Sequence, residues 1–437
     1  MFGVAQGSYA LLGEDPGGGA PPEDDQEAAP DLLKEPAMRR TLGTGTSSRT
    51  RRTALVAAGL VAALAAGASA APAFAAPASA SAVSPAPVSA KATFAKVTSG
   101  PDAEALSAAL AGLPDHDATA ALLRVGGDGS WRGTAGVRDV RTGAPALENA
   151  RFRAGSVTKV VTAAIVLQLA AEGRIDLDGT VQRYLPGLLT EGFEPITVRQ
   201  LLNYTSGLRP GASLGDTVEE GFAHRFETLT PRQVVAASVA EGPAYAPGTR
   251  QTYGNIHYTV LGLLIEKVTG DSYAHQAQVR IFRPLGMRHS SFPAAGDTGI
   301  HGPHNRGYDW IDGKLVDVTD WNMTDRFAAG DLISTTADLE RFLVGLFRGR
   351  VVPEPQLDEM FTLPHVPDAH YGAALERIEL NGKVVWGKGG SRPGYTAAIA
   401  ATRDLSRTLV YSVNSTDAKG DGQQAAAERF AFPAFNR

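Results

Sequence analysis

Residues 160–171 (VVTAAIVLQLAA) are the most constraining stretch of this sequence, because they are apolar nearly all round the turn of a helix. A helix without a polar face has to be buried on every side. The chain has 437 residues, of which 43% are hydrophobic and 20% charged, and this is enough apolar material to build such a core. We therefore expect a large globular fold around a buried helix.

Composition excludes several classes of protein. The chain has no cysteine, which removes disulfides, thiol nucleophiles, cysteine-ligated zinc and iron–sulfur clusters. The formal net charge is −5, and no Lys/Arg-rich stripe marks a nucleic-acid surface in the folded part. No internal stretch is long and apolar enough to span a membrane. We expect no nucleic-acid partner.

The first part of the chain has the pattern of a secretory signal. The basic pair Arg51-Arg52 precedes an alanine-rich apolar run at residues 53–70, and a small-residue cleavage site follows at residues 73–75. A membrane anchor is the alternative interpretation of this run. The arginine pair also fits twin-arginine export, and translation starting at Met38 would give a signal of ordinary size. We expect a secreted protein with no membrane anchor after cleavage.

Three segments follow from this pattern. Residues 77–99 are rich in Pro, Ala and Ser, which is typical of a linker. The expected boundaries are a leader over residues 1–75, a linker over 76–100 and one catalytic domain over 101–437.

Strand patterns lie at both ends of that domain. Residues 119–125 and 130–136 flank the turn sequence Gly-Gly-Asp-Gly, which predicts a hairpin. Helical patterns dominate the middle of the domain, including residues 258–269. The sequence thus predicts an α/β fold with an antiparallel sheet shared by the two ends, flanking helices and a mostly helical subdomain. Further strands are expected at 383–387, 395–402 and 408–414.

A candidate nucleophile lies at the start of the buried helix. Ser156 precedes Lys159 by three residues, and no other of the nine lysines has a serine at that spacing. Residues i and i+3 share one face of a helix, so the Lys159 amine can reach the Ser156 hydroxyl. An uncharged lysine can act as a base, and burial beside another cation lowers its pKa toward that state. The alternative is an N-cap serine followed by a surface lysine.

Two further motifs follow in the chain. In Tyr253-Gly254-Asn255, the phenol can relay a proton and the carboxamide can hold a substrate amide. The alternative there is a loop tyrosine beside a turn asparagine. In Lys388-Gly389-Gly390-Ser391, the lysine can attract a substrate carboxylate and keep a nearby amine neutral. The glycines admit a substrate backbone, and the backbone N–H groups of Ser156 and Ser391 can form an oxyanion hole. A basic residue before a flexible turn is equally compatible with this second motif.

Three competing patterns are present in the sequence. The segment 211–215 (GASLG) fits a G-x-S-x-G nucleophile elbow around Ser213, but that elbow needs a strand before it and a helix after it. The triplet His370-Tyr371-Gly372 is a second choice for the third motif. His301 and His304 suggest a metal site, although no HExxH pattern or carboxylate cluster accompanies them.

The ordered motifs resemble the serine β-lactamase and penicillin-binding family, on the branch of class C β-lactamases and D-alanyl-D-alanine carboxypeptidases. This similarity implies a β-lactamase/transpeptidase-like fold and an acyl-enzyme on Ser156, with no metal or organic cofactor. Lys159 and Tyr253 would then share proton transfer, and Asn255, Lys388, Gly389 and Gly390 would bind substrate. The resemblance also extends beyond the motifs, to residues 152–159, 167–185, 196–208, 253–270, 284–287, 328–342 and 387–395.

Two residues depart from the family pattern. Gly389 stands where the family often has threonine, which removes a hydroxyl expected to bind a substrate carboxylate. Tyr204 stands where the family often has histidine. We expect an exported, monomeric hydrolase, with a D-alanyl-D-alanine carboxypeptidase-like peptidase ahead of a carboxylesterase or β-lactamase. Its substrate would be a small peptide, ester or β-lactam, with peptidoglycan a further partner, and a non-catalytic penicillin- or peptidoglycan-binding module is the alternative class.

Overall fold

The computed structural model describes residues 100–436. The leader and signal expected over residues 1–75, and the linker apart from Gly100, lie outside the described residues. Within them, no helix is long and apolar enough to cross a membrane.

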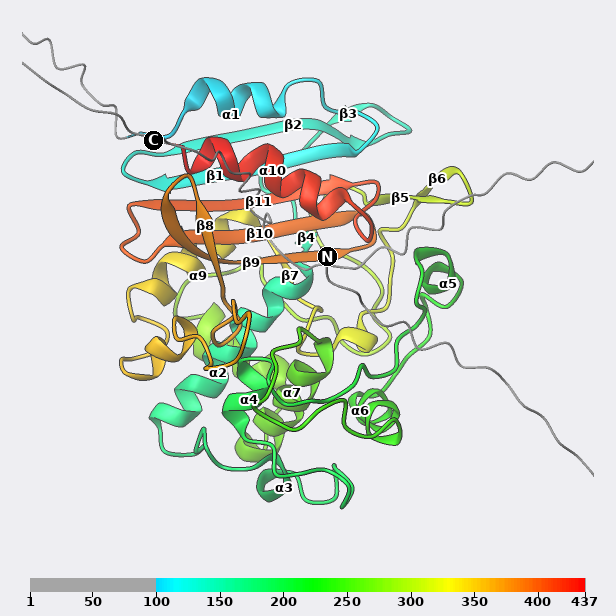
Figure 1. The fold of residues 1–437 in the computed structure, drawn as a ribbon. Helices are drawn as coiled ribbons and strands as arrows, with labels where there is room; N and C mark the ends of the chain where they lie inside the picture. The colour runs from blue at the N-terminus through cyan, green and yellow to red at the C-terminus, as the bar shows by residue number, and fades with distance from the viewer. Residues whose placement is uncertain (1–99, 437) are drawn as a thin grey trace, which may run out of the picture. The chain divides into compact units, whose positions relative to one another are not determined.

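A seven-stranded antiparallel sheet forms the centre of the described fold (Figure 1). The expected hairpin is its N-terminal part, and the first strand of that hairpin pairs with the last strand of the chain. The two ends of the domain therefore share one sheet, as the sequence predicts. In spatial order the strands are β3 (Ala144–Pro145), β2 (Trp131–Asp139), β1 (Ala118–Gly127), β11 (Arg407–Ser415), β10 (Tyr395–Thr402), β9 (Lys383–Arg392) and β8 (Glu376–Leu380).

Both faces of the sheet are covered, as the alternating residues of β10 show. Ala398 and Ala400 pack in one apolar cluster with α1 (Ala103–Leu110) and α10 (Gly422–Ala434). Ile399, between them in sequence, belongs to the larger cluster on the opposite face. Successive side chains of a strand point to opposite faces, so the middle of this central strand, residues 397–401, is apolar at every position. All eight of its residues are buried.

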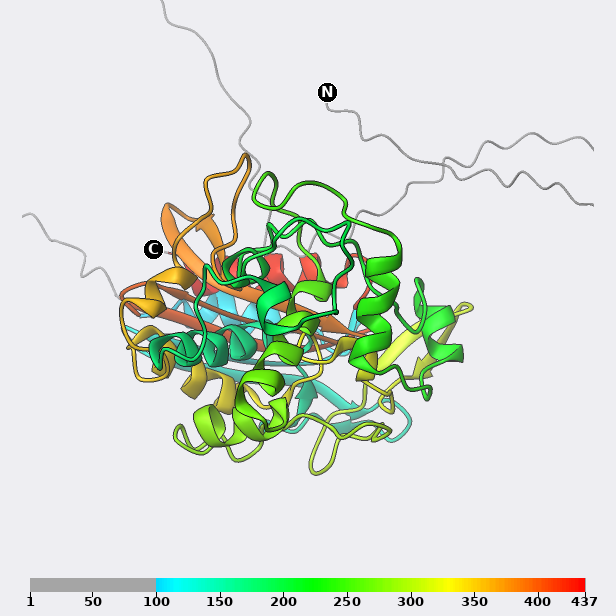
Figure 2. The ribbon, with the colours of Figure 1, turned by 90° about the horizontal axis from the view of Figure 1, so that it is seen from below.

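The larger cluster surrounds α2 (Thr158–Ala171), the helix expected from the apolar run. Eleven of its fourteen residues are buried, and its neighbours come from the helical middle of the chain. Seen from below, these helices lie in front of the sheet (Figure 2). They are α3 (Val181–Tyr184), α4 (Val198–Leu202), α5 (Val218–Ala223), α6 (Pro231–Ala240), α7 (Asn255–Thr269), α8 (Tyr273–Ala277) with a π-helical extension η2 (Gln278–Phe282), and α9 (Thr336–Phe347).

Short elements connect these layers. Two small antiparallel pairs accompany the main sheet, β4 (Phe152–Arg153) with β7 (Ile333–Ser334) and β5 (Tyr308–Ile311) with β6 (Lys314–Asp317). The 3₁₀ turns are η1 (Gly155–Val157), η3 (Thr324–Arg326) and η4 (Gln356–Met360). The first of these turns leads directly into α2.

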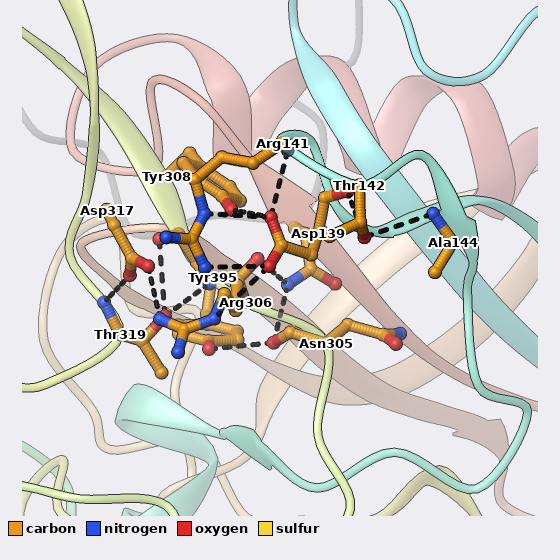
Figure 3. A network of polar contacts seen from close by, with 12 residues as sticks. Asp139, Arg141, Thr142, Ala144, Asn305, Arg306, Tyr308, Asp317, Thr319 and Tyr395 are labelled. Carbon is orange, nitrogen blue, oxygen red and sulfur yellow. Dashed lines mark hydrogen bonds and ion pairs between the residues drawn. The ribbon is translucent and has the colours of Figure 1, made fainter.

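A network of paired charges fixes the β5–β6 hairpin to the end of β2 (Figure 3). The Asp139 carboxylate accepts hydrogen bonds from Arg141 at 3.0 Å and from the Tyr308 hydroxyl at 3.0 Å. Arg306 lies 3.7 Å from the same carboxylate and also pairs with Asp317. These hydrogen bonds, chiefly those from Arg141, hold the pKa of Asp139 well below its ordinary value.

Candidate active site

Ser156 lies in the turn η1, at the mouth of α2. The turn is held by Thr158, whose hydroxyl donates to the Gly155 carbonyl at 2.7 Å and accepts from the Leu332 N–H at 3.0 Å. Gly155 has a φ of +52°, a region that L side chains rarely adopt, and a Cβ there would lie 2.5 Å from the Ser391 nitrogen. The glycine before the serine is therefore required by both backbone conformation and space.

Lys159 is fully buried and its amine faces Ser156. Its Nζ lies 3.1 Å from Ser156 Oγ, 2.7 Å from Asn255 Oδ1 and 2.7 Å from the Ala329 carbonyl oxygen. Burial, and after it the charge of Lys388, holds the pKa of Lys159 well below its ordinary value. A neutral amine has two N–H donors and one lone pair. The two carbonyl oxygens can only accept, so the lone pair remains for the Ser156 hydroxyl.

The hydroxyl of Tyr253 is buried beside this pair. It has no hydrogen-bond partner of good geometry among the described residues. The Ser156 hydroxyl is nevertheless near enough to lower the pKa of Tyr253, an effect smaller than that of burial. Burial raises the pKa of Tyr253 far above its ordinary value, so the phenol keeps its proton. The Lys159 amine lies 5.0 Å from the centre of the Tyr253 ring. A protonated phenol and a neutral amine thus flank the serine.

Lys388 approaches the same ring from the sheet. It is fully buried on β9, with its Nζ 4.7 Å from the centre of the Tyr253 ring and a hydrogen bond to the Gly389 carbonyl at 2.8 Å. Burial lowers the pKa of Lys388 to about 8. This amine keeps its proton more readily than Lys159 does, and it supplies the positive charge that keeps Lys159 neutral.

The third motif lies inside a strand, which the sequence did not predict. We expected a strand at 383–387 with the motif after it, whereas β9 continues to Arg392. The extension pairs with β10 alone, because β8 pairs only as far as Gly387. The segment from Lys388 to Arg392 is consequently an edge with one side free of a neighbouring strand, where an extended substrate can lie.

The two glycines of the motif have different surroundings. A Cβ on Gly390 would meet the Ala154 carbonyl and lie 2.6 Å from the Ser156 nitrogen, so β9 and the serine turn touch through their backbones. A Cβ on Gly155 would in turn lie 2.5 Å from the Ser391 nitrogen, so the backbone nitrogens of Ser156 and Ser391 belong to two segments in direct contact. A Cβ on Gly389 would meet only the side-chain amide of Gln423, at 2.6 Å. Gly390 is therefore sterically required, whereas Gly389 is not.

Several groups around the site were not found from the sequence. The Ala329 carbonyl and the turn η3 belong to a segment that touches α2 only in the folded chain. Tyr204 lies at the centre of an aromatic cluster, with its ring centre 5.0 Å from those of Tyr253 and Tyr371. Its departure from the family's histidine was visible in the sequence. Its packing role was not, since the partners are distant along the chain.

The competing patterns have other places in the structure. Ser213 lies in a loop with no strand before it, and its hydroxyl donates to the Gly215 carbonyl at 3.0 Å. Tyr371 packs against Tyr253, but the neighbouring His370 is exposed. His301 pairs with Asp297 at 2.8 Å and His304 contacts the Gly302 carbonyl. Within residues 100–436, no group of three or more metal-ligating side chains is present.

Two pockets meet at Asn255, beside the serine. The first, which we call the Tyr253 pocket, has a volume of about 380 Å³. The second, which we call the Arg392 pocket, has about 490 Å³. Both volumes fit small organic ligands. The Tyr253 pocket is lined among others by Leu208, Pro210, Val234, Tyr253, Ile256 and His257.

His257 adds a neutral imidazole to the Tyr253 pocket. Its Nδ1 lies 3.1 Å from the Gly254 carbonyl, and burial lowers the pKa of His257 to about 4. The ring is therefore uncharged at neutral pH. It packs edge-on against Tyr204. The charged side chains that line this pocket are Asp216, Asp325 and Arg326, and all three also line the Arg392 pocket.

The serine–lysine pair, the buried phenol and the second lysine define a serine hydrolase site without a histidine base. A family model described as Beta-lactamase matches residues 106–432 of this chain. The chain belongs to this β-lactamase/transpeptidase-like family of serine hydrolases, and the fold expected from the resemblance is confirmed.

Individual relatives carry several activities in their names. A D-stereospecific amidohydrolase from Streptomyces sp. has 34% identity and a TM-score of 0.67, over 76% of this chain and 99% of the other. Penicillin-binding protein 4* of Bacillus subtilis is 26% identical over 314 residues, 68% of each chain. Esterase EstB of Burkholderia gladioli is 32% identical over 200 residues, which is 43% of this chain and 50% of the esterase.

Proposed function

We propose that this protein hydrolyses amide bonds at the carbonyl of a D-amino acid residue, through an acyl-enzyme on Ser156. The observation that carries this proposal is the buried Lys159 amine, 3.1 Å from Ser156 Oγ and bonded otherwise to two carbonyl oxygens. The preference for the D configuration is supported by the similarity to the Streptomyces amidohydrolase over 99% of its chain.

Acylation starts with proton transfer from Ser156 to Lys159. The serine oxygen attacks the substrate carbonyl, and the resulting oxyanion accepts hydrogen bonds from the backbone N–H groups of Ser156 and Ser391. As the carbon–nitrogen bond breaks, the leaving amine takes a proton from the Lys159 and Tyr253 pair. Lys388 holds positive charge beside the phenol throughout. A water molecule then attacks the ester on Ser156 by the reverse of these proton transfers, which releases the acid and restores the serine.

Gly389 favours an amidase over a carboxypeptidase. A D-alanyl-D-alanine carboxypeptidase releases an amino acid whose carboxylate has to be bound, and the sequence lacks the hydroxyl expected at this position for that purpose. An amide or ester leaving group carries no such carboxylate. The carboxypeptidase activity remains the second candidate, because Lys388 is present and relatives named as penicillin-binding proteins match the chain. The non-catalytic alternative is disfavoured by the full set of catalytic groups in one place.

The setting of the enzyme is part of the proposal. The signal pattern before residue 76 supports export, and we propose that the mature enzyme meets small amides, peptides or esters outside the cytoplasm. We also propose that one chain is sufficient for activity, since Ser156, Lys159, Tyr253 and Lys388 all come from the same chain.

The test compares D- and L-phenylalanine amide, an acetylated D-alanyl-D-alanine peptide and a fluorescent penicillin. We expect turnover of the D-amide, slower turnover of the L-amide, and a transient acyl adduct by intact mass. Ser156→Ala should abolish the adduct, whereas Ser213→Ala, which removes the competing serine, should retain it. Cleavage of the peptide with no turnover of the D-amide would establish the carboxypeptidase instead, and a stable penicillin adduct without any turnover would favour the binding module.

A further inference from the structure

The Arg392 pocket lies along the continuation of β9 beyond Ser391. Arg392 follows Ser391 on the strand, Arg326 comes from η3, and Lys419 comes from the loop between β11 and α10. The Lys419 amine lies 3.4 Å from the Ser391 carbonyl oxygen. Three basic side chains from three distant segments, two of them guanidiniums, therefore converge next to Ser391.

One buried carboxylate serves two of these cations. Asp325 is 4% exposed and lies 3.4 Å from the Arg392 guanidinium and 3.0 Å from that of Arg326. Arg392 is itself 3% exposed, and its Nε has no hydrogen-bond partner among the described residues. A guanidinium has five N–H donors. The buried part of this pocket thus has more N–H donors than Asp325 can accept from.

The other two carboxylates of the pocket lie at its exposed rim. The Asp417 carboxylate accepts hydrogen bonds from the backbone N–H groups of Gly420 and Asp421, at N–O distances of 3.0 and 3.1 Å. These bonds close the loop before α10. Asp216 lies 3.5 Å from the Ser213 hydroxyl. Solvent screens these exposed carboxylates, so neither neutralises the buried Arg392 guanidinium as a buried partner would. Lys419 lies at the same exposed rim.

The direction of the substrate along β9 follows from the proton donor. The leaving amine has to take its proton near Tyr253, whose ring lies under Lys388 at one end of the edge segment. The acyl part of the substrate therefore extends the other way, past Ser391 toward Arg392. Resting on the proposed function, we propose that the Arg392 pocket binds a carboxylate on the acyl part of the substrate, so that the preferred substrates are D-amino acid amides with an acidic side chain.

The experiment compares the α-p-nitroanilides of D-glutamic acid and D-glutamine, which have nearly the same shape and differ in charge. A buried charge-assisted hydrogen bond predicts that kcat/KM for the glutamic acid anilide exceeds that for the glutamine anilide by about tenfold. Lys419→Gln should reduce this ratio, and Lys419→Glu should bring it below one. Lys314→Gln, at an exposed lysine on β6, is the matched control and should leave the ratio at the wild-type value.

The outcomes separate this inference from the function on which it rests. Equal kcat/KM for the two anilides, in an enzyme that turns over D-phenylalanine amide, overturns the carboxylate site and leaves the amidase intact. A preference that survives both Lys419 variants also overturns it. A purely structural role of Lys419 would lower both rates and leave their ratio unchanged, which again contradicts the proposal. Failure to turn over any D-amide overturns the proposed function and this inference together.

Discussion

The Asp139 network and the Ser156 site both contain basic side chains, but these side chains are charged in the first region and Lys159 is neutral in the second. Around Asp139, cations and carboxylates lie next to one another, and each group keeps its charge (Figure 3). Around Ser156, the hydrogen bonds of Lys159 go to uncharged oxygens alone, so burial removes its proton. Ion pairs between the charged side chains around Asp139 therefore fix the structure. Burial of Lys159 without an ionic partner instead leaves a neutral amine that can act as a base.

Among the variants that test this difference, Lys159→Met should have the largest effect on activity. Without the general base, kcat/KM for D-phenylalanine amide should fall by about 10²–10⁴-fold. The fold should survive, because an apolar side chain of similar length replaces an amine that has no ionic partner. Steady-state kinetics and a thermal melt measure the two effects. A variant with near wild-type activity would show that Lys159 is not the base, and Lys314→Met is the matched control.

Gly390→Ala tests the contact between β9 and the serine turn. The new Cβ would lie 2.6 Å from the Ser156 nitrogen, so the strand has to move away from the nucleophile. Displacements of this size at a reacting centre cost on the order of 100-fold in rate.

The neighbouring Gly389→Ala is the control for that strand. Its Cβ meets only the flexible end of Gln423, and we expect a loss of a few-fold at most. Equal losses at the two positions would contradict the close approach of Gly390 to the Ser156 nitrogen. Gly389→Thr has a further use, since it should raise cleavage of D-alanyl-D-alanine peptides relative to amides.

Lys388→Met tests whether the charge of Lys388 helps to keep Lys159 neutral. Lys388 is a cause of the lowered pKa of Lys159, second to burial. Removing its charge should raise the pKa of Lys159, so the fraction of neutral amine at a given pH falls. The acid limb of the kcat/KM profile should therefore move to higher pH. An unchanged limb would mean that the two lysines do not interact.

Asp139→Asn is the smallest effect and concerns stability alone. The pKa of Asp139 is depressed in the folded protein, so its contribution to stability is present above the ordinary value of 3.8 and is lost as the pH falls below it. The variant should melt a few degrees lower at pH 7 with unchanged kcat/KM, and the difference should shrink toward pH 3. A loss of activity at an unchanged melting temperature would instead give Asp139 a role in catalysis and none in stability.

Local spacing predicted the parts of the site that lie within one element. Ser156 and Lys159 are three residues apart at the start of a helix, and that geometry follows from helical periodicity alone. The apolar run also predicted α2, which begins two residues earlier than expected, at Thr158. The turn sequence predicted the N-terminal hairpin, and the sequence also predicted the three C-terminal strands.

Contacts between distant segments could not be predicted in this way. The length of β9 depends on its pairing with β10, which continues as far as Arg392 and Tyr395. The Ala329 carbonyl reaches Lys159 across 170 residues of chain. The ion pair of Asp325 with Arg392 joins residues 67 apart. No periodicity in the sequence records these contacts, although each shapes the site.

The pH dependence of the acylation rate of the wild-type enzyme shows whether Lys159 acts as a neutral base. A p-nitrophenyl ester in single turnover reports formation of the Ser156 ester, and the Lys159 and Tyr253 groups titrate as a coupled unit. A neutral Lys159 base predicts a rate that rises between pH 5 and 9, with its midpoint well below 10.4, the pKa of a lysine in water. A rate that is flat over this range, or that rises only near pH 10, would contradict a neutral lysine base.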